Sequence, residues 1–173
     1  MKKEKHSNCK CEFCQSGIEA FKAREAKLLK QVGHVIRYVM DEYDIQGHSF
    51  PSIYTYGLMQ TYNHYEIECV LPIDQEAALF LMNTLALKVK EGIRFEFDQM
   101  YQFPELNNVP FYFLPNIQLG SEMPVLRLVL ADPNNFFPED EDCEAIYAVQ
   151  PIIGIEKVSH LIEQYWMKEV ETD

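Results

Sequence analysis

The stretch Phe50-Pro-Ser-Ile-Tyr-Thr-Tyr-Gly-Leu58 decides how the chain divides into elements. Pro51 lacks a backbone N–H, so it favours the start of a strand over its centre. The β-branched and aromatic residues that follow favour extended backbone. Gly57 permits a bend that other residues resist. We therefore expect a strand that ends at Gly57, followed by a short helical turn or loop over residues 58–64.

The residues before this stretch predict a helix, a strand and a turn. Ser16 and Glu19 form a capping-box pattern, and Gly33 is a typical helix stop. Between them lies a mostly one-sided apolar stripe: Ile18, Phe21, Leu28, Leu29 and Val32. A strand is expected over residues 34–40, and the acidic residues 41–44 with Gly47 indicate a solvent-exposed turn.

After the stretch, alternation over residues 65–71 predicts a half-buried strand with Glu66 and Glu68 on its polar face. The clearest helix spans residues 74–91, with Asp74 as N-cap, Gly92 at the stop, and Phe80 and Leu87 widening its apolar stripe. Further strands are expected at 93–97, 111–114 and 125–130. A last helix is expected over 156–170, with Val158, Leu161, Ile162, Tyr165 and Trp166 on its packing face.

These elements do not alternate strictly, which favours an α+β fold: a single domain with a mainly antiparallel sheet and two or three packed helices. We expect a flexible, cysteine-bearing head over residues 1–15 and the domain over 16–173. No apolar run reaches the roughly 18 residues that a bilayer requires. The N-terminus leads into a polar stretch rather than an apolar signal core. We therefore expect a cytoplasmic protein that does not enter membranes.

Charge is divided unevenly along the chain. Residues 1–30 hold eight Lys/Arg and four Asp/Glu, whereas residues 31–173 hold seven and twenty-three. So acidic a body repels a phosphate backbone, and binding of duplex nucleic acid is not expected. The charge suits a basic protein partner, although it also serves solubility. The sequence leaves the question of a small-molecule ligand open.

Several short motifs, taken in order, resemble a bacterial domain family of unknown function, number 4262. They are Tyr-Thr-Tyr-Gly-Leu at 54–58, Leu-Met-Asn-Thr-Leu-Ala at 81–86, Leu-Arg-Leu-Val-Leu-Ala-Asp at 126–132, Phe-Pro at 137–138 and Gln-Pro at 150–151. The resemblance covers about residues 33–155, and many members also start with a Cys-x-Cys-x-x-Cys run. The chain departs from the pattern at Ile53, Arg127 and Ala131. The family implies no established activity.

The N-terminal residues Cys9, Cys11 and Cys14 offer three thiolates at close spacing. Zinc prefers about four nitrogen or sulfur ligands, and His6 is the nearest fourth. Cys143, Cys69 and His34 are alternatives if the head folds back onto the body. A structural zinc site is one interpretation. Free or disulfide-bonded thiols, or a redox or metal sensor that regulates the body, are the others.

No recognised catalytic motif is present, so an enzyme would have to use scattered side chains. His64, Tyr54 and Asp132 are the candidates for a hydrolase-like pocket near Tyr54–Leu58. Each has a simpler interpretation, such as surface histidine, packing tyrosine and turn-forming aspartate. Arg127 lies inside an apolar run, and a buried guanidinium needs an acidic partner, which favours a structural ion pair. The two main hypotheses are therefore a protein-binding module, toxin-neutralising or regulatory, and a small enzyme.

Overall fold

The structure, a computed structural model, describes residues 17–45, 48–118 and 121–166. Its strands are β1 (Val35–Ile45), β2 (His48–Tyr56), β3 (Glu66–Cys69), β4 (Phe111–Gln118) and β5 (Met123–Leu130). Its helices are α2 (Ile18–Val32), α3 (Leu58–Tyr62), α4 (Gln75–Lys90), α5 (Ala145–Ala148) and α6 (Ile155–Trp166), with a 3₁₀ turn, η1, at Pro104–Leu106.

The five strands form one sheet in the order β1-β2-β3-β5-β4. Only the β3–β5 pair is parallel, and the connection between these two strands contains α4 and β4. The remaining pairs are antiparallel. The predicted α+β domain with a mainly antiparallel sheet is therefore confirmed.

The first hairpin differs from the prediction in two ways. β1 continues through residues 41–44 to Ile45, so the predicted acidic turn is strand. Pro51 lies inside β2 rather than at its start. The register explains both, because Val39 pairs with Ser52 while Tyr43 pairs with Phe50, which places Pro51 opposite a bulge. A bulge leaves backbone groups unpaired, so a residue without an N–H costs little there.

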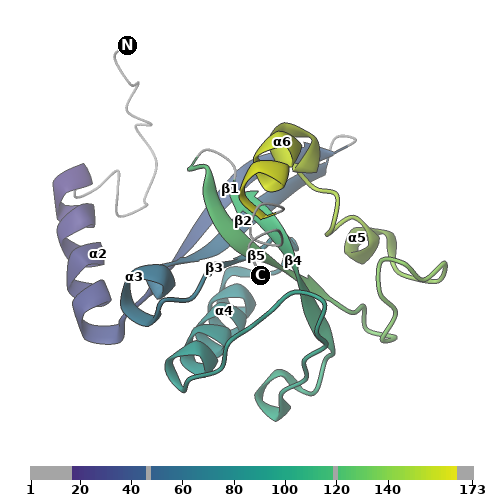
Figure 1. The fold of residues 1–173 in the computed structure, drawn as a ribbon, viewed down its shortest axis with the longest axis horizontal. Helices are drawn as coiled ribbons and strands as arrows, with labels where there is room; N and C mark the ends of the chain where they lie inside the picture. The colour runs from purple at the N-terminus through teal and green to yellow at the C-terminus, as the bar shows by residue number, and fades with distance from the viewer. Residues whose placement is uncertain (1–16, 46–47, 119–120, 167–173) are drawn as a thin grey trace.

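Helix α4 covers one face of the sheet and supplies much of the core (Figure 1). Asp74 caps it as predicted, accepting hydrogen bonds from the backbone N–H groups of Glu76 and Ala77 at 3.0 Å. Its buried side chains are Ala78, Leu81, Met82, Leu85, Ala86 and Val89. Phe80 and Leu87 do not widen this stripe, because both are exposed to solvent.

Two further predictions need correction. Residues 93–97 form no strand, although Phe95 is buried among the rings of Tyr101, Phe103 and Phe113. Aromatic packing and hydrogen bonds from the Phe95 and Glu96 N–H groups to side chains, not ladder pairing, hold this segment. Helix α6 packs against β4, and its Val158 and Trp166 belong to the same core cluster as the buried side chains of α4. Its Trp166 is buried, but Tyr165 is exposed.

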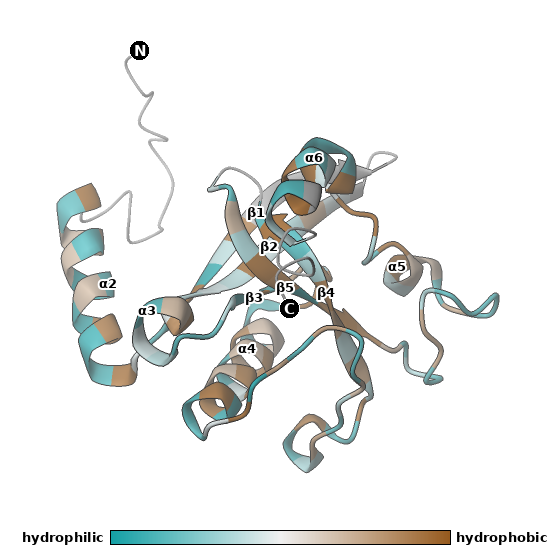
Figure 2. Ribbon diagram, viewed as in Figure 1, coloured by the Kyte–Doolittle hydropathy of each residue, from teal (hydrophilic) through white to brown (hydrophobic). Residues whose placement is uncertain are grey.

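Helix α2 stands at one end of the molecule (Figure 1). It begins after Gly17 and ends at Gly33, and none of its residues is buried. Figure 2 shows apolar and polar bands mixed along it. Within the described residues, no helix combines the length and hydropathy needed to span a membrane.

Candidate functional site

The sheet face opposite α4 holds a buried polar network centred on Glu68 of β3 and Arg127 of β5, which are neighbours in the parallel register. The Arg127 Nη2 and Nε atoms donate to Glu68 Oε2 at 2.8 and 3.1 Å. Asn116 Nδ2 donates to the same oxygen at 2.9 Å, and Ser52 Oγ donates to Oε1 at 2.9 Å. Both ionic side chains are essentially inaccessible to solvent. The predicted structural ion pair of Arg127 is thereby confirmed.

The network also fastens the chain after α5 to the sheet. Arg127 Nη1 donates to the carbonyl oxygens of Ile153 and Gln150. The Gln150 side chain accepts from the Leu130 N–H at 3.0 Å and donates to the Leu130 carbonyl at 2.8 Å. Gln150 therefore pairs with the end of β5 much as a neighbouring strand would.

Glu66 and Glu68 are not the solvated face that the alternation predicted, because every residue of β3 is buried. Glu66 Oε2 accepts from Thr55 Oγ1 at 2.7 Å. Its Oε1 accepts from the N–H groups of Gly57 and Met59 at 2.8 and 3.2 Å. Glu66 therefore holds the backbone at the start of α3, whereas Glu68 pairs with Arg127, and the two carboxylates do not share donors as an acid–base dyad would.

Gly57 is the pivot at which β2 passes into α3. Its φ of 110° lies in the left-handed region. A Cβ at this position would lie 2.4 Å from Leu29 Cδ2 and 3.0 Å from the Gly33 carbonyl oxygen. Glycine is therefore required both by the backbone conformation and by the approach of α2.

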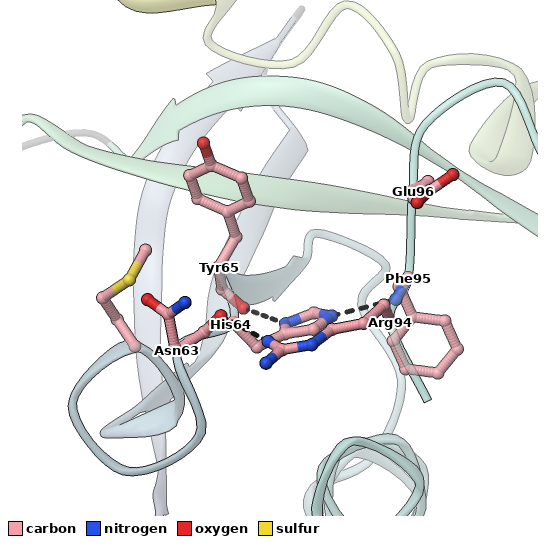
Figure 3. Close-up of a pocket in the computed structure, with 7 residues that line it drawn as sticks. Asn63, His64, Tyr65, Arg94, Phe95 and Glu96 are labelled. Atoms are coloured by element: carbon pink, nitrogen blue, oxygen red, sulfur yellow. Dashed lines mark hydrogen bonds between the residues drawn. The ribbon is translucent and has the colours of Figure 1, made fainter. Parts of the chain in front are cut away.

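A pocket of about 450 Å³ opens beside α3 and is lined by Met59, Asn63, His64, Tyr65, Arg94, Phe95 and Glu96 (Figure 3). It adjoins the predicted location, one residue beyond Leu58, but Tyr54 and Asp132 do not line it. Arg94 Nη1 donates to the Asn63 carbonyl, which ties the guanidinium to the pocket wall. Among the described lining residues there is no serine, threonine or cysteine to act as a nucleophile.

His64 is held by hydrogen bonds from both ring nitrogens (Figure 3). Nε2 accepts from the Phe95 N–H at 3.0 Å, so Nδ1 carries the proton and donates to the Tyr65 carbonyl at 2.6 Å. Desolvation by burial, with a smaller contribution from Arg94, lowers the pKa of His64 below 6.5. The imidazole is therefore neutral, and both nitrogens are engaged by backbone groups.

Tyr54 and Asp132 lie in other environments. The Tyr54 ring lies 5.9 Å from the Arg37 guanidinium, which is bound to Glu25 of α2 at 2.8 Å. Asp132 Oδ1 accepts from the N–H groups of Asn134 and Phe136, both at 2.8 Å. Although desolvation opposes it, these backbone donors and the Glu144 N–H lower the pKa of Asp132. Asp132 therefore holds a turn.

The proposed zinc ligands Cys9, Cys11, Cys14 and His6 lie outside the described residues, and the site stays a prediction. Of the alternatives, Cys69 is fully buried, and burial raises its pKa to about 12. His34 Nε2 is 3.0 Å from Asn83 Oδ1. Residues 17–45, 48–118 and 121–166 contain no group of three or more His, Cys, Asp or Glu arranged to hold a metal ion.

Residues 139–152, here called the acidic segment, were not singled out as a site by the sequence. The segment exposes five carboxylates, those of Glu139, Asp140, Glu141, Asp142 and Glu144, and includes no Lys or Arg. Two large apolar side chains lie exposed in the same segment, Ile146 at 43% and Ile152 at 59%. The dense run of acids was the available signal, but only the structure shows that the two isoleucines are left uncovered.

Comparison with known proteins gives one match. A family model described as a domain of unknown function (DUF4262) matches residues 28–144, which include the sheet, α3, α4 and the pocket. The chain belongs to this family. The predicted resemblance is confirmed, and the matched region leaves out most of α2 as well as α5 and α6. No curated protein and no solved structure matched the chain.

Proposed function

We propose that this member of the family is a protein-binding module whose acidic segment receives a basic partner, in a toxin-neutralising or regulatory role. The observation that carries the proposal is the exposure of Ile146 and Ile152 within a segment that carries five acids and no base. Apolar side chains rimmed by charge are typical of protein interfaces. The charges give steering and specificity, and the isoleucines give buried area.

The acidic segment is held in place before any partner arrives, which lowers the entropic cost of binding. Glu144 is fixed through its N–H to Asp132 Oδ2 at 3.1 Å. The Tyr112 hydroxyl donates to Glu139 at 3.3 Å, and Gln150 pairs with Leu130 of β5. The segment is therefore joined to the sheet at both of its ends.

Co-expression with proteins encoded beside this one tests the proposal, because small binding modules and their partners are often produced together. We expect a complex that the double variant Ile146→Asp/Ile152→Asp weakens by about tenfold or more. Glu76→Lys/Glu122→Lys, which changes exposed acids elsewhere, serves as the control. Absence of any complex, or equal binding by both variants, counts against the proposal.

A second candidate function is favoured by the pocket beside α3, which lies close to the location predicted for a hydrolase-like enzyme. We propose that it binds a small anionic molecule, with Arg94 as the cationic anchor and Met59 and Tyr65 as apolar walls. Binding is favoured over hydrolysis because the described lining lacks a nucleophile and both His64 nitrogens are engaged. Any acid–base chemistry in this pocket would be carried out by Glu96.

Nuclear magnetic resonance with benzoate as the probe tests this second candidate. We expect shifts in the signals of residues 63–65 and 94–96 that disappear in Arg94→Gln. The variant Arg24→Gln, which removes a cation from α2, is the matched control. Shifts that persist in Arg94→Gln exclude Arg94 as the anchor.

A further inference from the structure

The pocket beside α3 carries two opposite charges that do not neutralise each other. Arg94 and Glu96 lie on either side of the buried Phe95 in the segment that follows α4, and both are exposed. Figure 3 shows the guanidinium reaching toward Asn63 and the Glu96 carboxylate turned away from it. Neither side chain forms an ion pair with a described residue. The lining therefore holds one positive and one negative charge at separate points.

The hydrogen bonds of these two side chains leave several polar atoms open to a ligand. Arg94 uses Nη1 for the Asn63 carbonyl, and no described residue accepts from its Nε or Nη2. Glu96 Oε2 accepts from the Gln99 side chain at 2.7 Å, while no described donor reaches Oε1. His64 adds no charge at neutral pH, because desolvation lowers its pKa below 6.5. The net charge of the lining is therefore zero.

A neutral lining with two separated charges discriminates between classes of ligand. A simple anion is attracted by Arg94 but repelled by Glu96, and a simple cation meets the reverse. A ligand that carries both charges gains both attractions, and it is rejected when its charges are reversed in position. The lining therefore favours a zwitterion over either single ion.

The apolar wall of the pocket indicates what the two ligand charges are attached to. Met59 is 39% exposed, and a thioether side chain adapts to irregular shapes. Tyr65 is backed by Trp166, with the ring centroids 4.5 Å apart, so its ring offers a fixed apolar surface. The volume of about 450 Å³ is that of a typical small-molecule site. A compact ligand with an apolar side chain fits these walls.

We propose that the pocket binds a small zwitterion with an apolar group, of the class of the aromatic and branched-chain α-amino acids. Arg94 binds the carboxylate, Glu96 binds the ammonium group, and the apolar side chain lies against Met59 and Tyr65. The proposal rests on the second candidate function, because it adds an ammonium group to the anionic ligand proposed for the same pocket.

Nuclear magnetic resonance titrations of the full chain with four probes test the ligand class. L-Phenylalanine carries both charges and an apolar ring, 3-phenylpropionate lacks the ammonium group, phenethylamine lacks the carboxylate, and L-alanine lacks the ring. We expect L-phenylalanine to shift the signals of residues 63–65 and 94–96. It should bind at least about tenfold more tightly than each of the other three probes, because each of them loses one contact.

Two charge-removing variants should change the preference in opposite directions. Arg94→Gln should weaken L-phenylalanine and 3-phenylpropionate at least about tenfold, and phenethylamine should bind more tightly because a repulsion is removed. Glu96→Gln should weaken L-phenylalanine and phenethylamine and should strengthen 3-phenylpropionate. A misfolded variant would weaken every probe, so a gain in one probe separates charge from folding. Arg24→Gln and Glu76→Gln, which remove exposed charges elsewhere, should bind all four probes as the native chain does.

Three results would overturn the proposal. The first is equal binding of 3-phenylpropionate and L-phenylalanine, with no effect of Glu96→Gln, which would leave a simple anion site and the second candidate function standing. The second is equal binding of L-alanine and L-phenylalanine, which would remove the apolar wall from recognition. The third is the absence of any shift with L-phenylalanine up to about 10 mM, which is weaker than specific binding requires. If benzoate also produces no shift, the second candidate function fails as well.

Discussion

The two faces of the sheet are both buried, but by different means. Under α4, the strands contribute Ile53, Ile67, Leu126 and Leu128, and burial is a matter of apolar packing. On the opposite face, the same strands contribute Ser52, Glu68 and Arg127, together with Asn116 of β4. There, burial depends on every charge and donor finding a partner. Alternation along a strand therefore shows that two faces differ, but not that the polar one meets water.

The difference has an energetic consequence. Apolar packing loses stability in proportion to the atoms removed, and the remaining side chains can partly relax. An ion pair away from water behaves otherwise, because removing one partner leaves the other charged and desolvated. The polar face should therefore be the less tolerant of single substitutions and the more tolerant of paired ones.

Arg127→Met should produce the largest effect. It leaves Glu68 buried without its cation and releases the carbonyls of Ile153 and Gln150, so the free energy of unfolding should fall by about 3–5 kcal/mol. Urea denaturation followed by circular dichroism measures it. Adding Glu68→Leu should recover part of the loss, since it removes the orphaned charge.

Arg37→Met is the matched control for that change. Arg37 also pairs with a glutamate, Glu25 at 2.8 Å, but its side chain is 32% exposed instead of 1%. Water screens such a pair, so the loss should not exceed about 1 kcal/mol. If Arg127→Met and Arg37→Met lowered the free energy of unfolding equally, burial would not explain the difference between the two ion pairs.

Leu128→Ala should produce the second largest effect and measures the apolar face. Leu128 is fully buried opposite Phe113, and truncation leaves a cavity that costs about 3 kcal/mol. Leu87→Ala on the exposed side of α4 should cost less than about 1 kcal/mol. A second truncation in the apolar core should lower the stability of Leu128→Ala further. If it instead recovered stability, as Glu68→Leu is expected to do for Arg127→Met, the two faces would not differ in their response to paired substitutions.

The sequence predicted much of the apolar face and little of the polar one. Residues 125–130 and the helix capped by Asp74 carry local signals, namely a short apolar run and a helical period. The local sequence also indicated that Arg127 needs an acidic partner, because it lies inside an apolar run. The local sequence could not identify that partner, because Glu68 lies 59 residues away and only the parallel pairing of β3 with β5 brings the two side chains together.

The errors in the first hairpin have the same origin. The acidic character of residues 41–44 suggested a turn. In the structure, pairing with β2 resumes after the bulge opposite Pro51 and continues as far as Ile45. Register is a property of two strands at once, so neither segment reveals it alone. The enzyme hypothesis expected a pocket near Tyr54–Leu58, and the pocket in the structure begins one residue beyond that stretch, at Met59. The lining from residues 94–96 was not predicted, since a strand was expected there.

Ser52→Ala should have an intermediate effect and sharpens the contrast within the polar face. It removes the donor to Glu68 Oε1 at 2.9 Å but leaves the ion pair intact. A hydrogen bond to a buried carboxylate contributes roughly 2 kcal/mol, and differential scanning calorimetry would report the loss. Ser49→Ala, an exposed position on the same strand, should change stability by less than about 0.5 kcal/mol.

The smallest effect is expected at His64, where a buried polar group lies beside the pocket instead of inside the network. Its pKa is lowered in the folded state mainly by desolvation, so the folded protein binds fewer protons than the unfolded chain. The contribution of His64 is then complete above pH about 6.5 and declines as the pH falls toward the lower folded value. Protonation of His64 would also break a hydrogen bond, because a protonated Nε2 can no longer accept from the Phe95 N–H.

Denaturation midpoints measured between pH 4 and pH 8 for three chains isolate this contribution. Relative to the native chain, His64→Gln should lose the part of the slope that lies below pH about 6.5. Arg94→Gln should still show a dependence of stability on pH, but a weaker one, because the neighbouring positive charge no longer opposes protonation of the imidazole. A slope unaltered by His64→Gln would show that protonation of His64 is not what makes the protein sensitive to acid.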